Sequence, residues 1–96
     1  MNTYAADLSS IQAAAKRIQG GVHETPVLTC SALDAMASRS LFFKCENLQK
    51  IGAFKMRGAL NAVMSLSEED ARRGVLTHSS GNFAQAVALA AKTRGI

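Results

Sequence analysis

Lys55 is the residue of this chain whose surroundings are best suited to covalent chemistry. It lies in the run Lys50-Ile-Gly-Ala-Phe-Lys-Met-Arg-Gly58, at the point where a loop is expected to enter a helix. A helix N-terminus carries about half a positive charge, and the neighbours Phe54 and Met56 are apolar. Both features favour an uncharged amine, the form that reacts with a carbonyl to give a Schiff base. An ordinary surface lysine at a helix start explains the same residues, so that alternative stays open.

A second polar run, Thr77-His-Ser-Ser-Gly-Asn82, follows a short apolar stretch and opens an expected helix. Successive backbone N–H groups at such a turn bind anions, and Ser79, Ser80 and Asn82 add side-chain donors. A carboxylate or a phosphate could be held there without a charged side chain. A simple helix cap, with Gly81 relaxing the turn, explains these residues equally well. The run is not a P-loop, because no Gly-Lys-Ser/Thr follows it.

The rest of the chain supplies the helices that must position these two runs. Apolar residues at helical spacing predict helices over four stretches: residues 11–18, 31–37, from Lys55 onward, and 82–92. Ser9 or Ser10 is expected to cap the first of these helices, and Ser31 the second. Ser67 is expected to cap a further short turn of helix, which Gly74 ends.

Two short stretches are expected to form strands, residues 40–46 and 75–77, and a helix follows each of them. Residues 23–29 are interpreted as a connector and a short edge segment. A strand–helix–strand–helix order is typical of a parallel α/β sheet covered by helices on both faces. Phe42 and Phe43 are adjacent on one strand and point to opposite faces, so both are expected in the core. The predicted fold class is therefore α/β.

Composition and charge narrow the classes of partner. The chain has 96 residues and is 48% hydrophobic, but much of this is alanine and only 5% is aromatic, so a small core is expected. The net charge is +4, yet Lys and Arg are scattered and no basic run of five occurs. This distribution argues against a nucleic-acid partner and suits the binding of small anions.

The cysteines and the apolar runs indicate the compartment. Cys30 and Cys45 have no metal-ligand spacing, so they are interpreted as reduced thiols, and no metal site is expected. The longest apolar run, Ala86 to Ala91, is far too short to span a bilayer. No signal peptide is visible. We therefore expect a cytoplasmic protein without a membrane partner.

Three runs, in this order, resemble one enzyme family. They are Ser40-Leu-Phe-Phe-Lys-Cys-Glu-Asn-Leu-Gln-Lys50, Gly52-Ala-Phe-Lys-Met-Arg-Gly-Ala59 and Thr77-His-Ser-Ser-Gly-Asn82. Over nearly its whole length the chain is similar to the N-terminal part of a pyridoxal-phosphate (PLP) enzyme of the tryptophan-synthase-β type, fold type II. Within that group it is most similar to serine racemases and to threonine and hydroxyaspartate dehydratases.

The resemblance implies a two-domain α/β enzyme with parallel sheets flanked by helices. Residues 1–68 would belong to the N-terminal part of the large PLP domain, and residues 75–96 would begin the small mobile domain. The resemblance also implies that the chain is truncated after Ile96, that it is inactive alone, and that the full-length protein is a homodimer.

The resemblance further implies roles for the residues around the cofactor. Lys55 matches the lysine that binds PLP covalently and then moves the α-proton. Phe54 matches the aromatic residue beside the cofactor ring. Asn82 matches the residue that donates a hydrogen bond to the phenolic oxygen of the cofactor.

The same family assigns substrate roles to the second run. Ser79, Ser80, Gly81 and Asn82 lie in the turn that receives the substrate carboxylate. Ser80 matches the acid/base on the face opposite Lys55, where simple threonine dehydratases usually have alanine. Two bases on opposite faces would permit racemisation, and a β-hydroxyl would permit loss of water to give a keto acid and ammonia. The implied substrate is serine, threonine or 3-hydroxyaspartate.

Two positions depart from the family pattern. Phe83 stands where histidine is usual, and a phenyl ring cannot donate a conventional hydrogen bond. Ile51 stands where the ATP-regulated animal enzymes have threonine, although Ser31 and Lys50 resemble residues of their nucleotide site. A nucleotide or divalent-cation effector of the full-length protein therefore stays open. The alternatives to the combined activity are a dehydratase without racemase activity and a small anion-binding module without catalysis.

Overall fold

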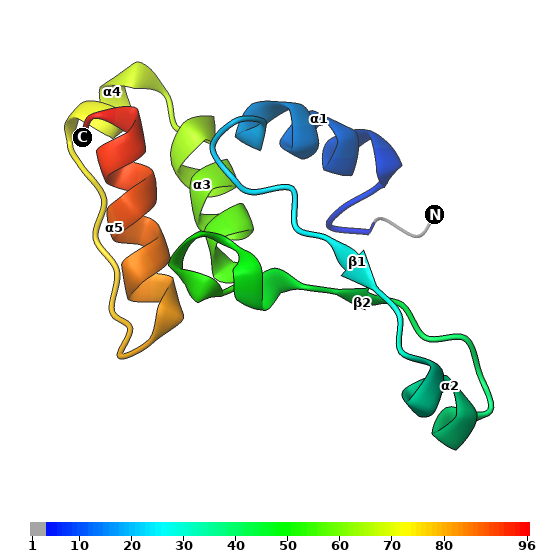
Figure 1. Cartoon of the computed structure of the whole chain (residues 1–96). Coiled ribbons are helices and arrows are strands. Elements are labelled where there is room, and N and C mark those ends of the chain that lie inside the picture. Colours follow the sequence, from blue (N-terminus) through cyan, green and yellow to red (C-terminus); the bar gives the residue numbers. More distant parts are fainter. Residues whose placement is uncertain (1–3) are drawn as a thin grey trace.

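The structure, a computed structural model, describes residues 4–96. Figure 1 shows four helices gathered in one body and a narrow arm, made of two strands and one helix, that extends away from it. The Cα radius of gyration is 16.4 Å, larger than the roughly 12.5 Å of a compact domain of this length. In chain order the elements are α1 (Leu8–Ile18), β1 (Val27–Leu28), α2 (Ser31–Ala37), β2 (Phe43–Lys44), the 3₁₀ turns η1 (Glu46–Leu48) and η2 (Lys50–Gly52), α3 (Lys55–Ser65), α4 (Glu68–Arg72) and α5 (Asn82–Arg94).

The predicted helices are all present, but two of the predicted caps are wrong. Asp7, rather than Ser9 or Ser10, caps α1: its carboxylate accepts the Ser10 N–H at 2.7 Å, and the Ser10 hydroxyl accepts the Asp7 N–H at 2.9 Å. An Asp caps as well as a Ser, so the helix begins at the earlier signal. The N-cap of α2 is Cys30, not Ser31, and no side chain caps that helix.

The cap of α4 is confirmed. Ser67 is its N-cap, and the Ser67 hydroxyl accepts the Asp70 N–H at 3.0 Å. Gly74 follows with a φ of 78°, a backbone conformation that glycine adopts without the steric cost that a side chain brings. This turn releases the chain into the extended segment that runs back toward the start of α5 (Figure 1).

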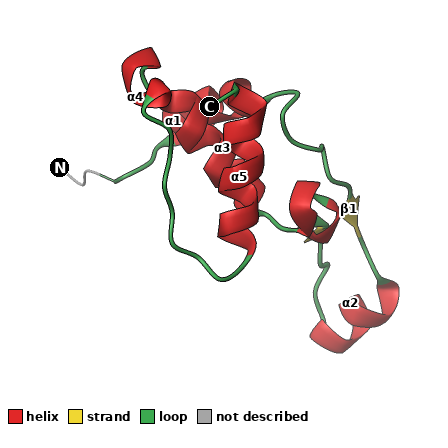
Figure 2. Cartoon of the chain, turned by 90° about the vertical axis from the view of Figure 1, so that its left-hand side faces the viewer, coloured by secondary structure: helices red, strands yellow, loops and turns green. Residues whose placement is uncertain are grey.

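The strands pair differently from the prediction. β1 and β2 form an antiparallel ribbon in which Val27 faces Lys44 and Leu28 faces Phe43. No parallel pairing occurs within residues 4–96, and residues 75–77 are extended without a strand partner there. The chain turns back through α2 at the tip of the arm, so its two flanking strands run in opposite directions (Figure 2).

The prediction that Phe42 and Phe43 lie in the core is wrong for this structure. Their side chains are 71% and 40% exposed. A two-stranded ribbon has no packed layer over either face within the described residues, so alternation along the strand buries neither ring. Leu76, in the extended segment, is fully exposed for the same reason.

The core lies between α3 and α5, which stand side by side in both views (Figures 1 and 2). Its buried members are Ile18 of α1, Met56, Ala59, Leu60 and Val63 of α3, and Ala86 and Ala90 of α5. Alanine on the α5 face lets the two helix axes approach closely. The link after α1 is also tight, because a Cβ at Gly21 would lie 2.3 Å from a methyl group of Leu60.

Helices α3 and α5 run in the same direction (Figure 1). At their C-terminal ends, the Arg94 guanidinium donates to the Val63 carbonyl and lies 3.0 Å from the Glu68 carboxylate. Their N-terminal ends, at Lys55 and Asn82, therefore lie at the same end of the pair. The division into residues 1–68 and 75–96 stays a prediction, although the two segments share this core.

Candidate functional site

Lys55 is the first residue of α3, as the sequence predicted, and its side chain is exposed. Its Nζ lies 5.2 Å from the centroid of the Phe54 ring, within the range of a cation–π contact. Met56 is fully buried and Ala53 nearly so, which anchors the backbone on both sides of the lysine. A firmly held backbone therefore presents an accessible amine beside an aromatic ring.

The turn Ser79–Asn82 leads directly into α5. The Ser79 hydroxyl accepts the Gly81 N–H at 3.2 Å, and Gly81 itself is the N-cap residue. No side chain caps α5, so neither serine nor Asn82 has the capping role that was the alternative interpretation. The first amides of α5 are thus left for another acceptor, and a Cβ at Gly81 would meet nothing within 4 Å.

The parallel course of α3 and α5 brings these two features to one end of the helix pair. Both helix N-termini carry partial positive charge, so this end favours an anionic ligand. The relation of Ser80 to Lys55 across a substrate stays a prediction. The sequence treated the two runs as separate motifs; the packing of Met56, Leu60 and Ala86 in one core is what unites them.

Phe83, which departs from the family pattern, belongs to the apolar side of this end. Its ring lines a pocket of about 160 Å³ between α3, α5 and the extended segment. The other lining residues are Ala59, Ala62, Val63, Leu66, Val75, Leu76, Thr77 and Val87. The phenyl ring is thus part of an apolar packing site.

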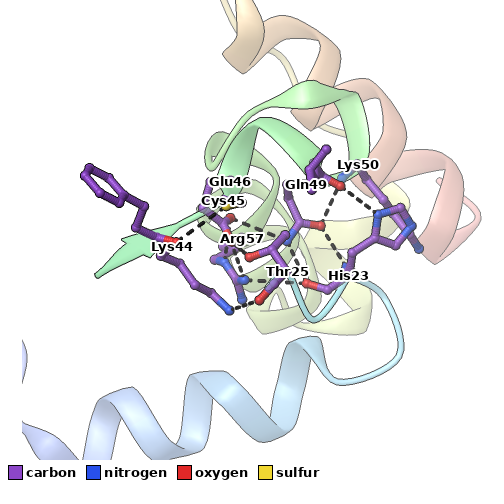
Figure 3. A network of polar contacts seen from close by, with 10 residues as sticks. His23, Thr25, Lys44, Cys45, Glu46, Gln49, Lys50 and Arg57 are labelled. Carbon is purple, nitrogen blue, oxygen red and sulfur yellow. Dashed lines mark hydrogen bonds and ion pairs between the residues drawn. The ribbon is translucent and has the colours of Figure 1, made fainter. Parts of the chain in front are cut away.

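A group of hydrogen-bonded side chains lies just before α3 and was not singled out from the sequence (Figure 3). We call Thr25, Glu46, Gln49 and Arg57, with the backbone of His23, the Glu46 cluster. The Arg57 guanidinium binds the Glu46 carboxylate through Nη2 at 2.6 Å and Nε at 2.8 Å, and the Thr25 hydroxyl donates to the same carboxylate at 2.5 Å. Thr25 and Gln49 are only 6% and 3% exposed. These polar residues flank Lys55 in the sequence, a signal that could have identified them.

The charge of Glu46 is strongly favoured by this cluster. The Arg57 hydrogen bonds, assisted by Thr25, lower the pKa of the Glu46 carboxyl from its ordinary value of 4.5 to about 2, against the opposing effect of burial. The same contact raises the pKa of Arg57. The pair therefore stays ionised throughout the neutral and mildly acidic range.

This shift predicts an acid-dependent loss of stability. Because the folded pKa lies below the unfolded one, the stabilisation is complete above pH 4.5 and is lost as the pH falls toward 2. Glu46→Gln should lower the free energy of unfolding by about 1.5–3 kcal/mol near neutral pH, and by less at about pH 3. Urea unfolding of the chain at the two pH values, followed by circular dichroism, measures this difference.

Glu69→Gln is the matched control for that experiment. Glu69 pairs with Arg73 at 2.6 Å, but both side chains are at least 70% exposed, so the pair contributes little. An equal loss of stability in both variants, or a loss that does not change with pH, would contradict the prediction.

Within residues 4–96, no group of three or more His, Cys, Asp or Glu side chains is placed to hold a metal ion. Over the same residues, no helix combines the length and the apolar character needed to cross a bilayer.

Comparison with known proteins identifies the class. The family described as pyridoxal-phosphate dependent enzyme matches residues 18–96, and the chain therefore belongs to that family. The serine racemase of Arabidopsis thaliana is 61% identical to it over 93 residues, which are 97% of this chain and 28% of that protein. The chain thus spans about 28% of the length of this relative.

Solved structures agree with this assignment. Maize serine racemase matches 97% of this chain with a TM-score of 0.92 and 58% identity, over 29% of its own length. A bacterial-type threonine deaminase, that of T.th., matches 95% with a TM-score of 0.84 and 43% identity, over 32% of its length. The predicted resemblance to fold type II PLP enzymes of the serine racemase and threonine dehydratase group is confirmed.

The residues present fit PLP. An aldehyde needs an accessible amine, and Lys55 is exposed, with no hydrogen bond or ion pair to the described residues. Phe54 offers an exposed aromatic face beside it. A Cβ at Gly58, one turn into α3, would meet nothing within 4 Å, so the backbone there leaves open space.

Proposed function

We propose that this chain contributes the lysine and the substrate turn of a PLP-dependent site that racemises and dehydrates a small hydroxy amino acid. Serine, threonine and 3-hydroxyaspartate are the candidate substrates. The observation that carries the proposal is the exposed Lys55 amine, beside Phe54, at the same end of the α3–α5 pair as the uncapped turn Ser79–Asn82. The likeness to serine racemases and to a threonine deaminase supports it.

The substrate turn binds and orients. The free amides at the start of α5 accept the substrate carboxylate without a cationic side chain. Ser79 and Gly81 keep the turn in shape through their hydrogen bond, and Asn82 directs its amide toward the phenolic oxygen of PLP. Phe54 lies against the cofactor ring. Held in this way, the Cα–H bond of the substrate is aligned for proton removal.

Two side chains then move protons. PLP, when bound, supplies the electron sink that makes the α-proton acidic. The Lys55 amine takes that proton from one face, and the Ser80 hydroxyl returns a proton on the other face, which inverts the configuration. When the β-hydroxyl leaves instead, water is lost, and hydrolysis of the product gives a keto acid and ammonia.

A chimera tests this proposal directly. The 93 matched residues of the Arabidopsis serine racemase are replaced by the corresponding residues of this chain. We expect the chimera to bind PLP, and borohydride reduction followed by peptide mass analysis to find the pyridoxyl group on Lys55. Lys50, in the same run, serves as the internal control lysine. Chiral chromatography and a keto-acid assay then measure racemisation and dehydration of L-serine.

A folded chimera that carries no pyridoxyl group on Lys55 would refute the proposal. A chimera that attaches PLP and releases keto acid without D-serine would instead support a dehydratase without racemase activity.

We infer further that the full-length protein is a cytoplasmic homodimer without a nucleic-acid partner. The dispersed charge supports the last point, because Arg57, Arg73 and Arg94 are each engaged by carboxylates. Ser31 begins α2 and Lys50 begins η2, so a nucleotide effector would contact the arm and the turn before Lys55. Size-exclusion chromatography with light scattering measures the assembly of the chimera.

A further inference from the structure

The turn that precedes Lys55 has an uncommon backbone. Ile51 has φ 62° and ψ 6°, and Gly52 follows with φ 71°. The left-handed region is costly for a β-branched side chain and is retained only where the surroundings enforce it. The Ile51 side chain is half-buried and packs against the core. Some further contact must hold the rest of this turn.

The Glu46 cluster holds it from both ends. Before the turn, the Gln49 amide accepts the His23 N–H at 2.7 Å and donates to the His23 carbonyl at 2.8 Å. After the turn, Arg57 binds both oxygens of Glu46 and approaches the same His23 carbonyl at 3.5 Å. Residues 50–56 are thus a short loop closed on one common segment of chain.

Lys55 lies within that loop and has no comparable support of its own. Its amine is placed only against Phe54, which is 61% exposed. The direction of the lysine side chain therefore depends on the backbone that leads into α3. That backbone depends in turn on the hydrogen bonds of Gln49 and Arg57 (Figure 3).

We propose that Arg57, acting through Glu46 and supported by Thr25 and Gln49, is a positioning residue for Lys55. The cluster keeps the Ile51–Gly52 turn in its left-handed form and so aims the amine at the PLP aldehyde. The inference rests on the proposed role of Lys55. A planar guanidinium suits this task, since its fork binds both carboxylate oxygens at once, whereas an ammonium group is a single point of charge.

The test is Arg57→Lys in the chimera, which keeps the charge and removes the fork. The first measurement is the rate at which apoprotein attaches PLP to Lys55, trapped with borohydride at intervals. We expect this rate, and kcat, to fall about 10- to 100-fold, and KM to change less than about threefold. The circular dichroism of the bound cofactor should change as well, because a redirected lysine alters the asymmetry around the ring.

Arg73→Lys is the matched control, since Arg73 pairs with Glu69 and Asp70 on the exposed side of α4. Thr25→Val is a milder second variant that removes one hydrogen bond and leaves the Glu46–Arg57 pair. It keeps the test decisive if Arg57→Lys fails to fold, and it should slow PLP attachment in the same direction.

The outcomes separate this inference from the proposed function. If Arg57→Lys, or Thr25→Val in its place, lowers the melting temperature but attaches PLP at the rate of Arg73→Lys, the cluster is only structural and the inference is overturned. If the unsubstituted chimera attaches no PLP to Lys55, the proposed function fails and the inference fails with it.

Discussion

Lys55→Ala in the chimera should abolish covalent attachment of PLP and lower kcat/KM for both racemisation and dehydration by about 10³-fold or more. The amine is the group that would hold the cofactor and also the group that would take the α-proton, so one substitution removes both. The exposed setting of Lys55 makes a folding defect a poor explanation, because its side chain has no packing partner besides Phe54. Absorbance of the bound cofactor and borohydride-trapped mass measure the first effect, and initial rates measure the second.

Lys50→Ala is the control for this experiment. Lys50 precedes the Ile51–Gly52 turn and is half-buried, so its loss tests whether any nearby lysine serves. We expect PLP to remain attached to Lys55 in that variant. A Lys55→Ala protein that still carried a borohydride-stable pyridoxyl group would end the assignment of this residue.

Ser80→Ala should separate the two reactions. Racemisation needs a proton donor on the face opposite Lys55, whereas dehydration begins with removal of the α-proton on the Lys55 side alone. We expect D-serine formation to fall by about 10²- to 10⁴-fold, while keto-acid formation stays within about threefold of the unsubstituted chimera. Ser80 is exposed and makes no side-chain hydrogen bond among the described residues, so its replacement should leave the fold intact.

Ser79→Ala is the matched control for Ser80→Ala. The Ser79 hydroxyl accepts the Gly81 N–H and shapes the turn that would bind the substrate carboxylate. Its loss should raise KM for both reactions together and leave their ratio unchanged. An equal decline of both activities in Ser80→Ala, or no decline in either, would contradict the model of two bases on opposite faces.

Most helices were predictable because their signals are local. The start of α3 at Lys55, the Ser67 cap of α4, and the Gly95 end of α5 depend on residues within one turn of the position concerned. Even the wrong cap of α1 was missed by only one turn. Asp7 and Ser9 are equally good signals, and the chain uses the first.

Strand pairing was not predictable in the same way. The periodic pattern of residues 40–46 indicates an extended chain, but it does not say which segment is its neighbour. The pairing of β2 with β1, and hence the exposure of Phe42 and Phe43, depends on where α2 turns the chain back. That turn joins segments that are not adjacent in the sequence.

The sequence by itself determined the chemistry that this protein carries: a lysine at a helix start beside an aromatic ring, and a serine-rich turn at the start of another helix. These depend on residue types and short spacings, which persist in any fold that forms the helices. Only the tertiary structure decided that both starts lie at one end of α3 and α5, and that Glu46, Gln49 and Arg57 close the loop around Lys55. Those contacts join segments separated by 11 to 34 positions. Hydrogen-bond direction and close packing across such separations are settled by the folded chain as a whole, because no local pattern encodes them.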